Sequence, residues 1–230
     1  MSEKLNVLLV HGAWADGSCW AKVIPLLEAK GLRVNAAQIP LTSLEDDVAV
    51  TRRLLATIKS PTILVGHSYG GAVITAAGVD VPNVKALVYI TAFGLDEGES
   101  LASLSQQGPA PAGASAVEPD EQGFLWINRS RFHSAFAADA TDKEAGIMAV
   151  VQKPLAVASF AAKCGVPAWK TLPSWYLQCT EDQMIPPPAQ GLMAKRMGAT
   201  VRTVAASHAV FMAHPGEVAD IIGLAATSAA

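Results

Sequence analysis

The sequence predicts an α/β fold: a six-stranded, mostly parallel sheet with helices on both faces and a small helical cap inserted after the fourth strand. Short apolar runs alternate with helical segments along most of the 230 residues, a pattern typical of a parallel sheet covered by helices. The alternation breaks between Phe93 and about Pro173 and then resumes. This interruption is too long for a connection and too short for an independent domain. We therefore assign residues 1–92 and 174–230 to the core and residues 93–173 to the cap.

Most of the six predicted strands are short and rich in aliphatic residues, as buried parallel strands are. They are Leu5–Val10, Arg33–Ala37, Ile63–Val65, Val84–Thr91, Trp175–Cys179 and Val201–Val204. Apolar residues at helical spacing predict the helices between them. These are Trp20–Lys30, a helix that opens at Ser43, Gly71–Ala77, Pro187–Met197 and Glu217–Ala226. Ser43 is the predicted N-cap of its helix, and Asp46 is predicted to complete a capping box with it.

The predicted cap divides into two parts by composition. Gly, Pro and Ala dominate Gln106–Gly123, so we expect a loop there. Residues Phe124–Lys163 are predicted to form short helices. They carry the aromatic side chains Trp126, Phe132, Phe136 and Phe160. We expect this segment to cover the edge of the sheet at which the functional residues gather.

Composition and charge exclude several classes of function. The chain is 51% hydrophobic and 16% charged, yet no apolar run reaches the roughly 20 residues that span a membrane. A net charge of −3 gives no basic surface for nucleic acid. The five histidines and three widely spaced cysteines match no metal or disulfide framework, so we expect no metal. The first strand begins at Leu5, which leaves no room for a secretory peptide, and we expect a cytoplasmic protein. The pattern indicates no oligomeric state.

The motif Gly-His-Ser-Tyr-Gly at residues 66–70 is the most informative feature of the chain. The apolar strand Ile63–Val65 leads into it, and the small-residue helix Gly71–Ala77 leaves it. Gly-x-Ser-x-Gly at a strand–helix junction predicts a nucleophile elbow, a turn so sharp that small residues must flank the serine. Ser68 is therefore the candidate nucleophile, presented at the carboxyl end of the sheet. A glycine-rich turn that only happens to hold a serine is the alternative.

A serine hydroxyl needs a base to take its proton and a carboxylate to orient that base. In proteins with this elbow, the groups follow in the order serine, acid, histidine. Asp182 lies in the loop just past the fifth strand, and His208 lies just past the last strand. Both therefore share the sheet edge that carries Ser68. Glu181, beside Asp182, and Asp96, after the fourth strand, are the alternative acids.

The third requirement is a pocket for negative charge, because a developing oxyanion needs two backbone N–H donors. Tyr69 directly follows the candidate nucleophile and supplies one of them. The second comes from the loop after the first strand, where Ala13 supplies the N–H and Gly12 lets the backbone approach. A His-Gly pair after a strand is weak evidence alone, but the elbow about 55 residues later strengthens it.

These motifs make the chain resemble the α/β-hydrolase superfamily along essentially its whole length, above all the small esterase/hydroxynitrile lyase group that includes plant methyl-salicylate esterase. The resemblance rests on residues 10–14 (Val-His-Gly-Ala-Trp), 65–71 (Val-Gly-His-Ser-Tyr-Gly-Gly), 179–186 (Cys-Thr-Glu-Asp-Gln-Met-Ile-Pro) and 207–208 (Ser-His). It implies a catalytic triad of Ser68, Asp182 and His208. It further implies the oxyanion donors Ala13 and Tyr69 and no cofactor.

The activity implied by the resemblance is hydrolysis of a small-molecule carboxylic ester through an acyl-enzyme. The alternatives are hydroxynitrile lyase or perhydrolase activity on the same triad, and a ligand-binding receptor with residual hydrolase activity. Lyases of this group place a threonine where Gly12 stands and a lysine where this chain has Ala209, so ester hydrolysis is favoured. Trp14, Trp126 and Phe132 are the candidate residues of the substrate pocket.

Overall fold

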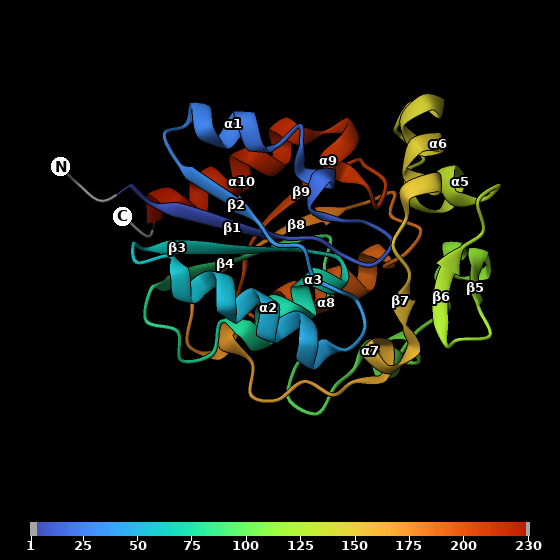
Figure 1. Ribbon diagram of the computed structural model, residues 1–230, viewed down its shortest axis with the longest axis horizontal. Helices are drawn as coiled ribbons and strands as arrows, with labels where there is room; N and C mark the ends of the chain where they lie inside the picture. Colours follow the sequence, from blue (N-terminus) through green and yellow to red (C-terminus); the bar gives the residue numbers. More distant parts are fainter. Residues whose placement is uncertain (1–3, 229–230) are drawn as a thin grey trace.

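The computed structural model describes residues 4–228 and has a six-stranded sheet at its centre (Figure 1). The strands lie in the order β2-β1-β3-β4-β8-β9. Their bounds are β1 Asn6–Val10, β2 Arg33–Ala36, β3 Thr62–His67, β4 Val84–Ile90, β8 Ser174–Cys179 and β9 Thr200–Val204. Every neighbouring pair is parallel, so all six carboxyl ends meet at one edge. The predicted fold class is confirmed. The expectation about a secretory peptide involves residues 1–3, which lie outside the described range, and stays a prediction.

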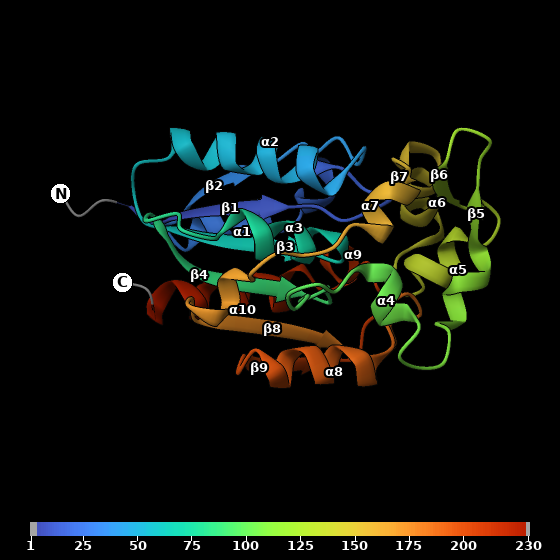
Figure 2. The ribbon, with the colours of Figure 1, turned by 90° about the horizontal axis from the view of Figure 1, so that it is seen from below.

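Helices cover both faces of this sheet. They are α1 Ile24–Ala29, α2 Leu44–Thr57, α3 Tyr69–Ala77, α8 Pro187–Arg196, α9 Val210–Ala213 and α10 Pro215–Ser228. On one face α1 packs against α10, and on the other α2 packs against α3 (Figures 1 and 2). The strands β1 and β3 between these layers are buried throughout. No helix within residues 4–228 has the length and apolar character needed to cross a membrane.

Two local details differ from the sequence prediction. Residues Gly17–Trp20 form a separate 3₁₀ turn, and α1 begins only at Ile24. Proline cannot follow a helical turn without losing a hydrogen bond, so Pro25 marks a helix start. At α2, the Ser43 hydroxyl accepts the Asp46 N–H as predicted (3.0 Å). The capping box is wrong in its second half, because the Asp46 carboxylate accepts the Thr42 hydroxyl instead (2.9 Å).

The segment between β4 and β8 is not purely helical, which corrects the predicted cap. Its helices are α4 Leu101–Ser105, α5 Phe132–Phe136, α6 Asp142–Val151 and α7 Val157–Ala161, with 3₁₀ turns at Ala112–Ala116 and Ala168–Lys170. Its strands β5 Val117–Pro119, β6 Phe124–Ile127 and β7 Leu155–Ala156 form an antiparallel sheet in the order β5-β6-β7. The Phe-Leu-Trp-Ile run of β6 has high strand propensity. Asp120 and Gly123, with φ 82°, form the turn before it.

This segment stands beyond the carboxyl ends of the core strands. Figures 1 and 2 both show β5, β6 and α5 on the side to which the arrows of β1, β4 and β8 point. The loops that leave the core strands therefore run directly into the segment. Any site at the carboxyl edge of the sheet lies beneath it.

Gly70 and Gly71 allow the start of α3 to approach the ends of β1 and β4 closely. A Cβ on Gly70 would lie 2.6 Å from the carbonyl oxygen of Val10 and 2.7 Å from that of His11. A Cβ on Gly71 would lie 2.7 Å from the Cβ of Ala92. Real side chains do not approach backbone this closely, so these positions require glycine. The N-terminus of α3 is thereby held against the sheet edge.

We expect Gly70→Ala to destabilise the fold by about 1–3 kcal/mol, because its methyl group must displace backbone carbonyls of the first strand. Gly146→Ala is the matched control, since Gly146 is exposed in α6 and its Cβ would have nothing within 4 Å. That substitution should instead stabilise by about 0.5–1 kcal/mol. Urea unfolding of both variants measures the difference. Equal stability of the two variants would contradict the close-approach argument.

Candidate active site

The backbone at Ser68 makes an abrupt turn between β3 and α3. Ser68 has φ 52° and ψ −123°, a conformation that non-glycine residues rarely adopt. Its N–H donates to the carbonyl of Ile90 at the end of β4 (3.2 Å), and its own carbonyl accepts the N–H of Gly71 (2.9 Å). These bonds hold the strained turn in place. Strain of this kind costs energy and persists only where the surroundings impose it, commonly at functional sites.

The structure brings Ser68, His208 and Asp182 into one hydrogen-bonded relay. Nε2 of His208 lies 2.8 Å from the Ser68 Oγ, and Nδ1 of His208 lies 2.7 Å from Oδ2 of Asp182. Ser68 follows β3, Asp182 follows β8 and His208 follows β9. The three residues are buried, with exposures of 3%, 0% and 4% for Ser68, His208 and Asp182. The serine hydroxyl can donate to Nε2 while Nδ1–H donates to the carboxylate.

The Asp182 carboxylate is held from several sides. Its Oδ1 accepts the backbone N–H groups of Met184 (2.6 Å) and Ile185 (2.9 Å). Its Oδ2 accepts the hydroxyl of Thr91 and the side-chain amide of Gln190 (3.2 Å), in addition to the imidazole. A buried carboxylate needs this many donors to stay in place. Its orientation is therefore fixed before any substrate binds.

Gln190 and Thr91 are two site residues that sequence reasoning missed. Gln190 is fully buried in α8, and its side chain also accepts the N–H of Cys179 (3.0 Å) and donates to the carbonyl of Ile185 (2.8 Å). Thr91 directly follows β4 and has φ 38°, strained for a β-branched residue. A polar residue on the inner face of a helix was the available signal for Gln190. The available signal for Thr91 was its position as a polar residue directly after a strand.

The two alternative acids lie outside this relay. Asp96 pairs with Lys170 (2.8 Å), and the side chains of both are more than a third exposed. Its carboxylate also accepts the N–H of Glu97 (2.7 Å). Glu181 is exposed, and its backbone N–H donates to the carbonyl of Ala206 (3.2 Å). Geometry therefore favours Asp182.

Two further histidines border the site and are held neutral by burial. His67 donates from Nε2 to the carbonyl of His208 (2.9 Å), and burial keeps its pKa well below the usual value. His11 donates from Nδ1 to the carbonyl of Gly12 (2.9 Å), and its Nε2 accepts the N–H of Ile39 (3.2 Å). Burial lowers the pKa of His11 to about 4. Both imidazoles are therefore uncharged, and their hydrogen bonds hold the loops around the site in place.

The two candidate oxyanion donors stand next to the serine. Tyr69 begins α3 directly after Ser68, and a Cβ on Gly12 would lie only 2.7 Å from the Ser68 Cβ. The loop that carries Ala13 therefore passes against the candidate nucleophile. Both residues are buried, and within residues 4–228 neither N–H donates to another group. The two donors are thus free for an incoming oxygen.

The side chain of Tyr69 is anchored far from its N–H. Its hydroxyl donates to Oδ2 of Asp47 (2.6 Å), whose Oδ1 accepts the N–H of Leu41 (2.7 Å). Asp47 is fully buried, and burial raises its pKa to about 6. The carbonyl of Leu41 accepts the N–H of Ala156 from β7 (2.9 Å). The start of α3 is thereby tied to α2 and, through it, to the inserted segment.

The inserted segment also holds the backbone on both sides of His208. The N–H of Ala209 donates to the carbonyl of Phe136 (2.9 Å). The N–H of Ser207 donates to Oδ2 of Asp139 (2.8 Å), and its hydroxyl donates to Oδ1. The position of the imidazole therefore depends on residues from α5 and the loop after it.

The candidate pocket residues have different surroundings. Trp14 donates from its indole to the carbonyl of Leu125 (2.8 Å) and packs edge-on against Phe136 at 6.2 Å. Phe132 is fully buried behind Phe136, at 5.0 Å. Trp126 is 37% exposed and donates to Asp120 (2.8 Å).

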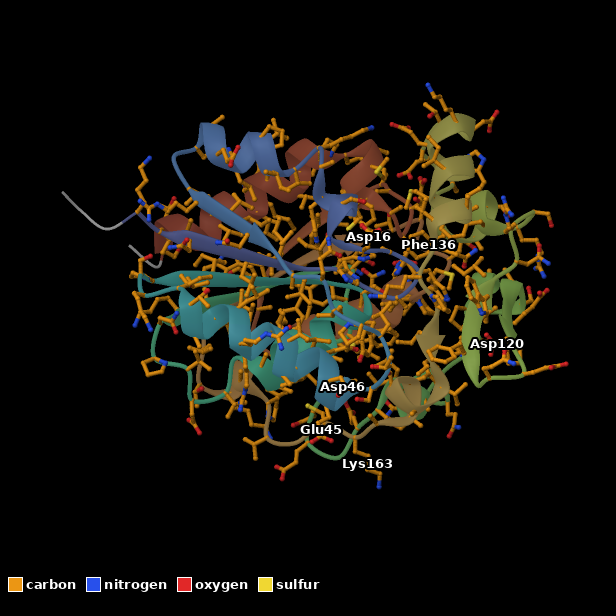
Figure 3. All side chains as sticks on the ribbon, in the orientation of Figure 1. Asp16, Glu45, Asp46, Asp120, Phe136 and Lys163 are labelled. Carbon is orange, nitrogen blue, oxygen red and sulfur yellow. The ribbon has the colours of Figure 1, made fainter. Side chains whose placement is uncertain are left out.

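Phe136, rather than Trp126, is the cap aromatic that meets the site. Its ring stands edge-on to the imidazole of His208, with centroids 5.0 Å apart. Figure 3 shows Phe136 where the inserted segment meets the core, whereas Asp120, the partner of Trp126, lies on the outer side. Trp126 therefore lies with its indole N–H on Asp120, and its role as a pocket residue stays a prediction. Among the residues with described placement, no three His, Cys, Asp or Glu side chains gather as metal ligands.

Comparison with known proteins identifies the family of the chain. The chain belongs to the α/β hydrolase family, because residues 7–221 match the sequence model of that family. It is similar to the pyrethroid hydrolase of Sphingobium wenxiniae, with 27% identity over 241 residues that cover 94% of this chain and 86% of that protein. A carbendazim hydrolyzing esterase of a Nocardioides species is 33% identical over 156 residues, covering 62% of this chain and 58% of that esterase.

The fold similarity extends over the whole molecule. The crystal structure of a pyrethroid hydrolase from Sphingobium faniae JZ-2 matches with a TM-score of 0.85 at 25% identity. The match covers 98% of each chain, and therefore includes the inserted segment as well as the core.

The burial of His11 predicts that the folded protein loses stability in acid. The pKa of His11 is about 4 in the folded state and about 6.5 when unfolded, so the unfolded chain binds the proton more tightly. The contribution of neutral His11 to the free energy of unfolding is therefore complete above pH 6.5 and is lost as the pH falls towards 4. It amounts to about 3 kcal/mol, at about 1.4 kcal/mol per pKa unit. Urea unfolding at pH 7.5 and pH 5 should show wild type losing stability.

Two variants test the assignment in opposite directions. His11→Asn should lose less stability than wild type between pH 7.5 and pH 5, because it has no imidazole to protonate. Asp47→Asn should lose more, because the raised pKa of Asp47 makes the wild-type carboxyl gain stability as the pH falls through 6. The same pH dependence in all three proteins would show that neither group carries the effect.

Proposed function

We propose that the protein is a cofactor-independent serine hydrolase that cleaves carboxylic esters. The observation that carries this proposal is the relay Ser68–His208–Asp182, buried at the strained elbow with both bonds at 2.7–2.8 Å. A relay of this geometry activates a hydroxyl for attack on an acyl carbon. The names of the similar pyrethroid hydrolase and carbendazim esterase agree with ester chemistry.

The proposed reaction proceeds in two halves. The Ser68 Oγ attacks the ester carbonyl while Nε2 of His208 takes the hydroxyl proton. The carbonyl oxygen becomes an oxyanion that accepts the N–H groups of Ala13 and Tyr69. When the tetrahedral intermediate collapses, the C–O bond to the alcohol breaks and His208 returns the proton to the leaving oxygen. Water then attacks the acyl-enzyme by the same route and releases the acid, while Asp182 holds Nδ1–H throughout.

The lyase alternative finds no support in the residues around the serine. A side chain at Gly12 would place its Cβ 2.7 Å from the Ser68 Cβ, so the loop leaves no room for a threonine. Ala209 is fully buried, with its N–H bonded to Phe136. An ammonium at that position would lack both space and solvent. Acyl transfer needs neither group.

We further propose that residues 93–173 act as a lid. Ser68 is only 3% exposed, and the ring of Phe136 stands 5.0 Å from that of His208. An ester therefore reaches the hydroxyl only when parts of this segment move aside. When the segment closes again, it excludes water from the site. Backbone N–H donors then stabilise an oxyanion more strongly than they do in water.

We expect Ser68→Ala to reduce ester turnover by about 10³-fold or more, because it removes the hydroxyl that lies 2.8 Å from Nε2 of His208. Hydrolysis of a nitrophenyl ester measures the effect, with thermal unfolding as the check on folding. A serine-directed phosphonate should label wild type at Ser68 and leave the variant unlabelled. Labelling of another serine, or turnover near wild type in the variant, would contradict the assignment.

A matched pair of substitutions tests which carboxylate orients the imidazole of His208. Asp182→Asn should lower kcat by about 10³–10⁴-fold, because the amide favours the wrong imidazole tautomer. Asp96→Asn removes a carboxylate of equal size whose exposed pairing with Lys170 contributes little, so its turnover should stay within about twofold of wild type. The reverse outcome would move the acid to the loop after β4.

A further inference from the structure

Asp47 is a fully buried carboxylate that takes no part in the relay of the candidate active site. Within residues 4–228 it forms no ion pair. Its oxygens accept two uncharged donors, the Tyr69 hydroxyl on Oδ2 (2.6 Å) and the Leu41 N–H on Oδ1 (2.7 Å). Burying a carboxylate costs several kcal/mol, and an apolar residue would fill the same place without that cost. Packing alone therefore does not explain a carboxylate here.

The backbone that carries Asp47 is itself held at the start of α2. The Asp47 N–H donates to the carbonyl of Ser43 (3.1 Å), and the Asp47 carbonyl accepts the hydroxyl of Thr51 (2.8 Å). The helix α2 packs against α3 on the same face of the sheet (Figure 1). The carboxylate is therefore a fixed acceptor for a group that α3 presents to it.

Tyr69 joins this carboxylate to the candidate oxyanion pocket. Its N–H follows Ser68 directly and has no acceptor within residues 4–228, and its hydroxyl lies at the far end of a rigid ring. Only the torsions χ1 and χ2 separate that ring from the Cα that carries the N–H. Both torsions are restricted, because the ring is buried and its hydroxyl is bonded. The bond to Asp47 therefore limits the directions in which the Tyr69 N–H can point.

We infer that Asp47 is a positioning residue, which holds the Tyr69 N–H towards the developing oxyanion by binding the Tyr69 hydroxyl. The inference rests on the proposed hydrolase function. An oxyanion donor is effective only at about 2.7–3.1 Å from the position of the charged oxygen, and a displacement of about 1 Å can lower the rate by about 10²-fold. Gly70 and Gly71 let α3 approach the strand ends, but they have no side chain that could orient residue 69.

The test compares nitrophenyl acetate with nitrophenyl thionoacetate, in which sulfur replaces the carbonyl oxygen. Sulfur accepts hydrogen bonds only weakly, so the oxyanion donors contribute less to cleavage of the thionoester. Tyr69→Phe removes the hydroxyl that binds Asp47 and keeps the N–H. We expect it to lower kcat/KM by about tenfold for the oxygen ester, mainly through kcat, and by at most about threefold for the thionoester. A merely structural loss would lower both values equally and leave their ratio unchanged.

Two further variants make the comparison specific. Asp47→Asn replaces one accepting oxygen by an amide donor, and it should lower the same oxygen-to-sulfur ratio. The double variant should lose no more than the larger single loss, because both changes act on one bond. Tyr89→Phe is the matched control, since the Tyr89 hydroxyl is also buried and bonds Thr75 of the same helix (2.9 Å). Its ratio should stay within about twofold of wild type.

Thermal unfolding and titration with a serine-directed phosphonate measure how much of each variant is folded and reactive. If Asp47→Asn does not fold, Tyr69→Phe still decides the question. If wild type cleaves the oxygen ester but Tyr69→Phe keeps the wild-type ratio, the positioning role is overturned and the proposed function stands. The same conclusion follows if a folded Asp47→Asn keeps the ratio, or if Tyr89→Phe lowers it equally. If wild type cleaves neither ester, both the role and the function are overturned.

Discussion

The sharp backbone turn at Ser68 determines how the carboxyl edge of the sheet is built. An L-residue at φ 52° costs roughly 1–3 kcal/mol and needs surroundings that impose it. The glycines at 70 and 71 remove side chains where α3 meets the strand ends, and the Ser68 N–H is fixed on Ile90. The turn raises the hydroxyl above the sheet edge. The parallel order of the strands then carries Asp182 and His208 to the same edge.

How much of this was predictable depends on the range of the interactions involved. Asp182 and His208 follow strands of a parallel sheet, and strand ends can be recognised from short local patterns. The β6 strand at Phe124–Ile127 pairs with the neighbouring β5 and with the more distant β7. Its run of residues has high strand propensity, so the prediction of helices there was wrong on a local signal. Gln190 and Phe136 join the site through contacts across 8 and 72 residues of sequence, to Asp182 and His208 respectively. The helix pattern marks Gln190 as a polar residue on the inner face of α8, but it does not identify Asp182 as its partner, and it gives no sign of the contact of Phe136 with His208.

The imidazoles of His11, His67 and His208 lie close together at this edge, and the proposed reaction assigns the proton to His208. The rings of His67 and His208 have centroids 4.8 Å apart. In the proposed reaction, a charge on His67 would oppose the charge that His208 gains with the serine proton, because like charges in a buried site repel strongly. Burial removes that conflict by keeping His67 neutral. The same burial limits His11 to holding its loop. His11 and His67 therefore have structural roles, because burial keeps both of them uncharged.

The carbonyl of Phe136 and the carboxylate of Asp139 accept hydrogen bonds from the residues that flank His208, so the inserted segment helps to place the proposed base. Modular exchange between relatives is restricted as a result. A segment transplanted from another hydrolase has to bring an acceptor for the Ala209 N–H and a carboxylate for Ser207, whatever substrate it selects. In this chain the insertion and the histidine loop are therefore one structural unit, and only the parts of the segment away from those two contacts can be exchanged without moving His208.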